Sequence, residues 1–115
     1  MAIRRLKRRP EFLQVASSGQ KAATPGLVLQ SRERADGEPL RVGFTASRKV
    51  GGAVERNRAK RRLRAAAEAV LGAKGRPATD YVLIARAETA RRPYALLLDD
   101  LGRALKRLDR GGEGR

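Results

Sequence analysis

The sequence contains no histidine and no cysteine. Without an imidazole or a thiol, the common pairs of catalytic nucleophile and general base cannot be assembled from this chain. The absence of cysteine also excludes a disulfide framework and a metal site built from thiolates. We therefore do not expect the chain to catalyse a reaction by itself.

Acidic residues are scarce and scattered, with 12 Asp or Glu against 27 Lys or Arg. A two-metal nuclease needs several carboxylates that converge on ions a few Å apart. The only adjacent pair is Asp99-Asp100, and neighbours on a helix point about 100° apart. We expect this pair to lie solvated on the surface. We also expect no metal or other cofactor to be held by the protein's side chains, so another component must supply any chemistry.

Long apolar runs are missing as well. None approaches the roughly 20 residues that span a membrane, and the basic N-terminus is not followed by the apolar core of a signal peptide. The cytoplasm is therefore the expected compartment.

Positive charge is what the chain has in excess, at a formal +15. Residues 1–64 carry 17 basic and 5 acidic side chains, whereas residues 65–115 carry 10 and 7. A field of this size and asymmetry predicts a nucleic-acid partner, with an anionic membrane surface as the weaker alternative.

The basic residues concentrate in the stretch 41–64, RVGFTASRKVGGAVERNRAKRRLR. Its first residues alternate like a half-buried strand, with Val42 and Phe44 on one face. From Ala53 the pattern is helical, and its spacing predicts a cationic ridge made of Arg56, Asn57, Lys60, Arg61 and Arg64. On the opposite side it predicts an apolar stripe made of Ala59, Leu63, Ala66 and Val70. One face of this helix is thus expected to dock on a core and the other to bind a polyanion.

Two features beside the ridge have alternative interpretations. Gly51-Gly52 before the helix would let a phosphate reach free N–H groups, with Arg48 and Lys49 adding charge; a plain strand-to-helix turn is the alternative. Asn57 is the only asparagine of the chain. Its amide can contact a phosphate, a 2′-hydroxyl or a base edge, and the alternative is an incidental surface residue.

The N-terminal third predicts a helix and a hairpin. The five basic residues within residues 1–9 form either a solvated terminus or a further part of the anion-binding surface. Pro10 begins a short helix that Gly19 ends. After a turn at Pro25-Gly26, residues 27–29 form a short apolar strand, and residues 32–39 form a hairpin turn into the strand at Arg41.

The C-terminal half predicts one strand and one helix. Residues 81–84 are continuously apolar, which is typical of a central strand covered on both faces. Pro93 begins a last helix with leucines at helical spacing, and Gly111-Gly112 ends it. The leucines are Leu97, Leu101, Leu105 and Leu108. The expected fold class is α+β, a single-domain sandwich with one sheet.

The segment SRKVGGAVERNRAKRRLR resembles the protein subunit of bacterial ribonuclease P, whose hallmark is an Arg-Asn-Arg triplet in a basic helix after a strand and a glycine-containing loop. The opening RLKRRPEFLQVASSG is similar to the first helix of that family, with Phe12 at its aromatic position. DYVLIARAE from Asp80 is similar to its last strand. The resemblance covers almost the whole chain, so we expect one domain over residues 1–110 and a disordered tail over 111–115.

The resemblance implies the order α-β-β-β-α-β-α with a left-handed crossover, a fold shared with a domain of one small-subunit ribosomal protein. It implies that the protein is the non-catalytic cofactor of an endoribonuclease. In that family the catalytic RNA subunit removes the 5′ leader of precursor tRNA by metal-dependent hydrolysis. The expected partners are this RNA subunit and the leader, with Mg²⁺ on the RNA, and neither a membrane nor a small-molecule substrate.

Two groups of residues follow from the resemblance by position. Those expected to face the RNA subunit are Arg56, Asn57, Arg58, Lys60, Arg61 and Arg64. Those expected to line a leader cleft between the sheet and the first helix are Phe12, Val28, Gln30, Arg48 and Lys49. Ala16 and Gln30 stand where the family often has aromatic residues, so stacking on the leader is expected to be thinner and charge to contribute more. For Phe12, a place in the core is the alternative.

Two other functions compete with this interpretation. A ribosomal or other structural RNA-binding protein would carry a similar charge without any role in processing, and co-purifying RNA distinguishes the two. A major-groove DNA binder could use the same helix, but no short recognition helix follows a tight turn here.

Overall fold

The strand β5, Thr79–Ala85, lies at the centre of the sheet because apolar residues cover both of its faces. In the computed structural model, which describes residues 3–109 apart from the side chain of Ser18, the sheet has the order β1-β4-β5-β3-β2. The strand β5 pairs antiparallel with β3 and parallel with β4. The other elements are β1 Arg4–Arg5, α1 Arg9–Ser18, β2 Gln20–Thr24, β3 Leu27–Glu33, β4 Arg41–Thr45, η1 Arg48–Val50, α2 Ala53–Lys74 and α3 Tyr94–Asp109.

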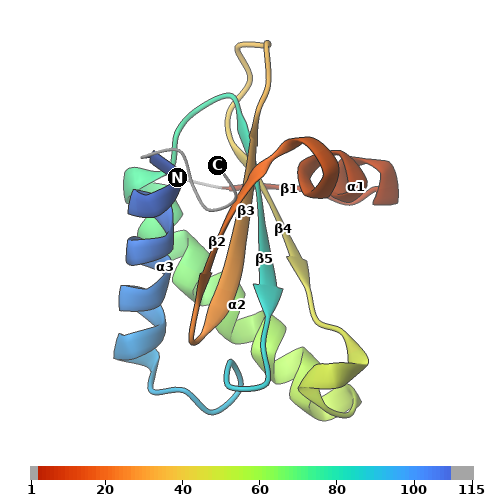
Figure 1. Ribbon diagram of the computed structural model, residues 1–115, viewed down its shortest axis with the longest axis vertical. Coiled ribbons are helices and arrows are strands. Elements are labelled where there is room, and N and C mark those ends of the chain that lie inside the picture. The colour runs from red at the N-terminus through yellow and green to blue at the C-terminus, as the bar shows by residue number, and fades with distance from the viewer. Residues whose placement is uncertain (1–2, 110–115) are drawn as a thin grey trace.

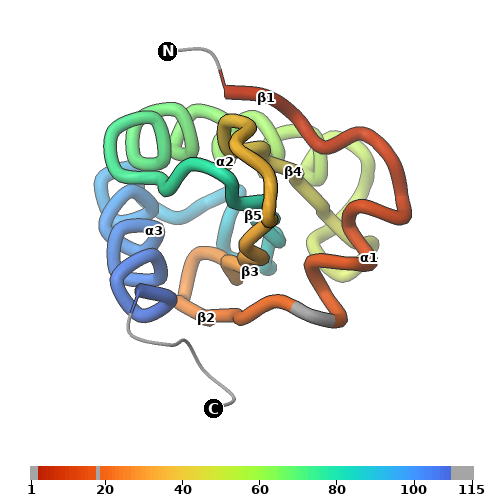
Figure 2. Tube along the Cα trace, turned by 90° about the horizontal axis from the view of Figure 1, so that it is seen from above, coloured from red at the N-terminus to blue at the C-terminus, as the bar shows by residue number. Residues whose placement is uncertain are grey.

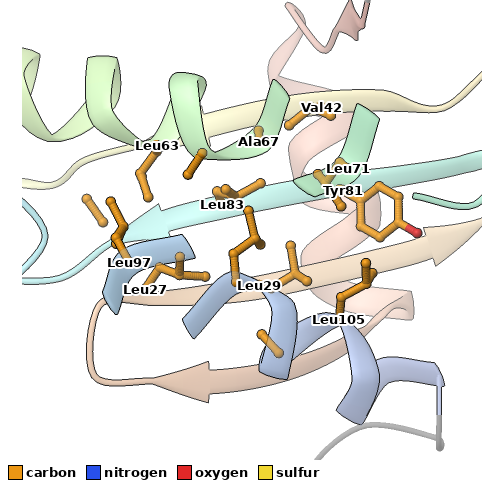
Figure 3. Packing of buried hydrophobic residues seen from close by; sticks show 14 of the residues in the cluster. Leu27, Leu29, Val42, Leu63, Ala67, Leu71, Tyr81, Leu83, Leu97 and Leu105 are labelled. Carbon is orange, nitrogen blue, oxygen red and sulfur yellow. The ribbon is translucent and has the colours of Figure 1, made fainter. Parts of the chain in front are cut away.

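The helices form two layers around the sheet. Figures 1 and 2 show α2 and α3 on one face and α1 on the other. The main core lies on the side of α2 and α3, where Leu29, Leu63 and Leu83 are fully buried (Figure 3). All four leucines predicted for α3 are buried there, as expected. A smaller cluster on the side of α1 comprises Leu6, Val15 and Val82.

The connection from β4 through α2 to β5 is a left-handed crossover. In Figure 1 both strands run downwards, α2 lies behind them and β5 lies to the left of β4. About 98 % of such connections between parallel strands are right-handed. The handedness implied by the resemblance is therefore confirmed, and the predicted element order fits once the short β1 is added before α1.

The predicted hairpin over residues 32–39 is wrong. The strand β5 lies between β3 and β4, so the segment crosses the end of β5 instead of turning back on β3. It is fastened there by two backbone bonds, from Arg34 N to Ala78 O at 2.7 Å and from Ala78 N to Glu38 O at 2.9 Å. The tight hairpin of this sheet joins β2 to β3 at Pro25-Gly26, where a turn was expected.

The two ends of the chain were predicted to be a basic N-terminal segment and a disordered C-terminal tail. Arg4 and Arg5 form the edge strand β1 beside β4, and Leu6 is buried, so the described part of the basic N-terminus is not frayed. The helix stop at Gly111-Gly112 and the tail 111–115 lie outside the described residues. Within residues 3–109, no helix combines the length and apolarity needed to cross a bilayer.

Asp100 is not solvated, contrary to the expectation from the Asp99-Asp100 pair. Its side chain is fully buried and hydrogen-bonded by Arg92 and by Arg103 Nη2, the latter at 3.1 Å. Asp99, one position along α3, is exposed. The sequence could not indicate this burial because both partner arginines also fit a solvent-exposed position.

Candidate nucleic-acid interface

The helix α2 buries the predicted apolar stripe, but its cations lie at other positions around the helix axis than the predicted ridge. Ala59, Leu63 and Ala66 are fully buried, and Val70 packs half-buried against the same core. Three half-buried cations of the helix each precede a buried residue by three positions, about 60° around the axis. These cations, Arg56, Lys60 and Arg64, therefore flank the buried stripe instead of lying opposite it.

Three of the six residues expected to face the RNA subunit, Asn57, Arg58 and Arg61, lie on the exposed face of α2. Within residues 3–109, these two arginines form no ion pair, and neither do the half-buried Arg56, Lys60 and Arg64. Elsewhere the carboxylates are used inside the protein, as in the pairs Arg34–Asp80, Arg41–Asp80 and Arg92–Asp100. The acidic residues thus neutralise cations that hold the fold together and leave the charge of α2 for an outside anion.

The connection between β4 and α2 holds two further exposed cations, Arg48 and Lys49 of η1, beside the buried Val50. Gly51 has φ 142°, a conformation that glycine adopts without strain. A Cβ at Gly51 would lie 2.6 Å from Oε2 of Glu55, so this carboxylate occupies the first turn of α2. A negative charge is stabilised at that end of a helix, which favours the plain strand-to-helix turn over a phosphate site.

On the other side of the sheet, Phe12 of α1 lies against Gly43 of β4, where any Cβ would clash with its ring. The ring packs half-buried on the cluster of Leu6, Val15 and Val82. Both interpretations of Phe12 therefore have support, since it contributes to packing and keeps an accessible surface. Glycine inside a strand often marks such a close approach, and this signal in the sequence was missed.

Val28 and Gln30 share this face with Phe12. The register places Val28 beside Ile84 and Gln30 beside Val82, and Thr45 adjoins Ile84 from the side of β4. Val28, Gln30, Thr45 and Ile84 are all half-buried, and α1 covers only part of the face (Figure 1). Ala16 is exposed on α1. The structure therefore brings three of the five expected leader residues to one face, while Arg48 and Lys49 lie beyond the end of β4.

The helix α1 is fixed over this face by Arg41. Its guanidinium donates to Glu11 Oε2 of α1 at 2.7 Å and to both oxygens of Asp80 in β5, at 2.8 and 2.7 Å. Burial opposes the charge of Asp80, but hydrogen bonds from Arg41 and Arg34 outweigh it and lower the pKa of the carboxyl group. Glu11 also accepts from the backbone N–H groups of Arg8 and Lys7, which lowers its pKa below the ordinary value although burial opposes the shift.

The N-terminal cations extend the positive surface around α1. Lys7, Arg8 and Arg9 are exposed, whereas Arg4 pairs with Glu38 at 3.0 Å and Arg5 lies 5.6 Å from the ring centre of Phe44. Within residues 3–109, no group of three or more acidic side chains is arranged to hold a metal ion. The arrangement suits a long polyanion that meets positive charge at α2, at η1 and before α1.

Comparisons with known proteins agree with this geometry. The family model described as Ribonuclease P matches residues 2–109. The chain is 50% identical over 117 residues to the ribonuclease P protein component of Caulobacter vibrioides, covering 97% of this chain and 78% of that protein.

Two solved structures have the same fold. The RNase P protein of Staphylococcus aureus is 25% identical and superposes with a TM-score of 0.76 over 91% of this chain and 94% of that one. For the RNase P protein of Thermotoga maritima, the identity is 27% and the TM-score 0.73, covering 92% of this chain and 96% of that one.

Proposed function

We infer that this chain, which belongs to the ribonuclease P protein family, is the protein subunit of a bacterial ribonucleoprotein that removes the 5′ leader of precursor tRNA. The single observation that carries this function is the exposed face of α2, whose arginines form no ion pair within residues 3–109. Such a face binds phosphates by releasing their counterions.

The catalytic RNA subunit is the proposed partner of α2. Arg58 and Arg61 meet its phosphates directly, and Asn57 beside them can bond a phosphate, a 2′-hydroxyl or a base edge. The half-buried Arg56, Lys60 and Arg64 reach the same RNA from the border of the buried stripe. Two guanidinium groups and one amide on the exposed side of the helix support this assignment.

The leader is the proposed ligand of the opposite sheet face. Phe12 offers a ring edge, Val28 and Gln30 offer a half-buried surface, and Arg48 with Lys49 offers charge at the end of β4. With one aromatic ring, stacking contributes about 1–3 kcal/mol for one base. Charge therefore supplies a larger share of leader binding than it would on a surface with several aromatic rings.

The protein itself is proposed to perform no chemistry. Its sequence has neither histidine nor cysteine, so hydrolysis is assigned to the RNA subunit and to Mg²⁺ ions bound by RNA phosphates. The protein contributes binding and orientation, which lower the barrier when they hold the substrate in a reactive geometry. The cytoplasm is the proposed compartment, because precursor tRNA is present there.

Affinity purification of the tagged protein tests this function against a structural RNA-binding role. The proposed function predicts one co-purifying RNA of a few hundred nucleotides, and the purified complex cleaves precursor tRNA at the leader junction. Recovery of ribosomal RNA in place of that RNA, without cleavage, would show that the protein belongs to a ribosomal particle.

A further inference from the structure

Arg62 differs from every other cation of α2. Its Nη1 donates to the carbonyl oxygen of Thr89 at 2.8 Å and its Nη2 donates to the carbonyl oxygen of Arg92. The side chain thus reaches across to the loop between β5 and α3. Within residues 3–109, no other cation of this helix has a hydrogen bond of this kind. Because both terminal nitrogens donate to backbone carbonyls, two of the five N–H donors are occupied and the guanidinium is oriented toward this loop.

The same loop is fastened to the hairpin that begins β3. The hydroxyl of Thr89, which is fully buried, donates to the carbonyl oxygen of Gly26 at 2.6 Å and accepts from Arg86 N at 2.7 Å. Nη1 of Arg86 donates to the carbonyl oxygen of Thr24 at 2.8 Å. Both sides of the β2–β3 turn are therefore held by residues 86–89.

A second attachment runs through the buried carboxylate of α3. Arg92, whose carbonyl receives Arg62, donates through its own side chain to Asp100. Asp100 in turn lies so close to Gly26 that a Cβ there would clash with it. Arg62 on α2 is consequently connected, through the single loop 86–92, to the start of the strand that carries Val28 and Gln30.

We propose that Arg62 is a positioning residue that sets the basic helix at a fixed geometry relative to the strand that binds the leader, through the loop 86–92, and that it is not an RNA contact. This proposal rests on the function proposed above, in which the RNA subunit binds α2 and the leader binds the opposite sheet face. In the complex, the RNA subunit holds the tRNA body and the sheet face of the protein holds the leader. The precursor gains affinity from the second contact only when both can form at the same time. If α2 is no longer held at a fixed position relative to β3, leader binding becomes weaker, while every contact between α2 and RNA phosphates remains.

The test measures two quantities on the reconstituted complex with its matched RNA subunit. The first is the salt dependence of RNA-subunit binding, and the second is the ratio of mature to precursor tRNA dissociation constants. For Arg62→Ala we expect the slope of log K against log salt to equal that of the wild type and the ratio to fall about fivefold. The matched control is the exposed neighbour Arg61→Ala, for which the slope falls by about 0.7 to 0.9 and the ratio is unchanged.

Thr89→Val tests the attachment of the loop 86–92 to the β2–β3 turn. The variant keeps the backbone carbonyl that accepts from Arg62. It removes both bonds of the hydroxyl, to the carbonyl oxygen of Gly26 and from Arg86 N, and the ratio should fall as in Arg62→Ala. Arg62→Lys should restore part of the ratio, because an ammonium group can still donate to a carbonyl. Both variants keep the test decisive if Arg62→Ala does not fold.

Two results would overturn the assignment. One is a slope reduced in Arg62→Ala as much as in Arg61→Ala, which would make Arg62 an RNA contact. The other is a wild-type ratio in folded Arg62→Ala, or in folded Arg62→Lys and Thr89→Val. Failure of the wild-type protein to bind the RNA subunit would instead contradict the proposed function itself.

Discussion

At the level of single residues, Arg58 and Arg61 are exposed, whereas the neighbouring unpaired cations Arg56, Lys60 and Arg64 are half-buried. An exposed guanidinium loses little packing when it is truncated, so its substitution isolates the electrostatic contribution. Arg56, Lys60 and Arg64 are half-buried and also cover part of the apolar stripe, and this mixed role complicates their interpretation.

We therefore expect Arg58→Ala to weaken binding to the RNA subunit and to lower the salt slope by roughly 0.7 to 0.9. The free energy of unfolding should change by no more than about 0.5 kcal/mol, as is usual for surface substitutions. Filter binding across a salt series, together with urea unfolding, measures both quantities. Normal RNA binding by a destabilised variant would make this face structural.

Phe12 and Lys49 allow leader binding to be separated from assembly. Phe12→Ala and Lys49→Ala should weaken precursor tRNA binding by the assembled complex while affinity for mature tRNA stays constant. Because Phe12 also packs on Leu6 and Val15, its loss should lower the stability, by no more than the about 3–5 kcal/mol typical of a fully buried ring. Thermal unfolding measured beside both affinities separates the two effects. Equal losses for precursor and mature tRNA in a folded variant would contradict the leader site.

At the level of elements, the position of α1 depends on a charged network that joins it to β4 and β5. Arg41 contacts Glu11 of α1 and the buried Asp80 of β5, and Arg34 contacts the same Asp80 from the loop after β3. Removing one partner of such a network leaves a buried charge uncompensated, at a cost of about 3–5 kcal/mol. The network therefore holds the helix that carries Phe12.

This network predicts the pH dependence of stability. The pKa values of Asp80 and Glu11 are lower in the folded protein than their ordinary values of 3.8 and 4.5. Their stabilisation is therefore complete above those ordinary values and is lost as the pH falls through the lower folded values. Urea unfolding between pH 2 and pH 6 should show this loss, with a shallower dependence for Glu11→Gln. An identical dependence in that variant would exclude Glu11 from the effect.

The sequence predicted the elements with strong periodicity and missed those that depend on pairing. The helical spacing of Leu63 and Leu97 located α2 and α3, since a buried stripe leaves a clear period. The strand β2 has only Ala22 and Thr24 buried, and such a pattern is too weak to identify a strand. The hairpin into Arg41 was wrong because a local turn signal cannot reveal that β5 pairs between the two strands.

The site was predictable in composition and only partly in orientation. The binding residues of α2 were identified from their charge and from the resemblance, but the cationic ridge was predicted to lie opposite the apolar stripe. Arg56 lies about 60° from the buried Ala59 around the helix, and the same offset separates Lys60 from Leu63. Arg62 was not distinguished from its neighbours, because nothing in a run of basic residues tells which guanidinium meets backbone carbonyls across the core.

At the level of the whole molecule, the distribution of charge separates folding from binding. Asp80 and Asp100 are buried among arginines that support the sheet and α3, while the formal charge of +15 is left to the surface. The isolated protein should therefore bind structured RNA with a strong salt dependence and cleave none. Incubation of repurified protein with precursor tRNA checks this. Cleavage that a point substitution in the protein abolishes would contradict a non-catalytic role.

The most direct measurement is the cleavage of precursor tRNA by the matched RNA subunit, with and without this protein, at constant Mg²⁺ and moderate salt. The protein should increase the rate constant divided by KM, and most of that gain should disappear when Arg58 and Arg61 are both changed to alanine. The gain should also shrink when the leader is shortened to a single nucleotide. Cleavage that is unaffected by the protein, or a gain independent of both the arginines and the leader, would contradict its assignment as the RNA-binding subunit of ribonuclease P.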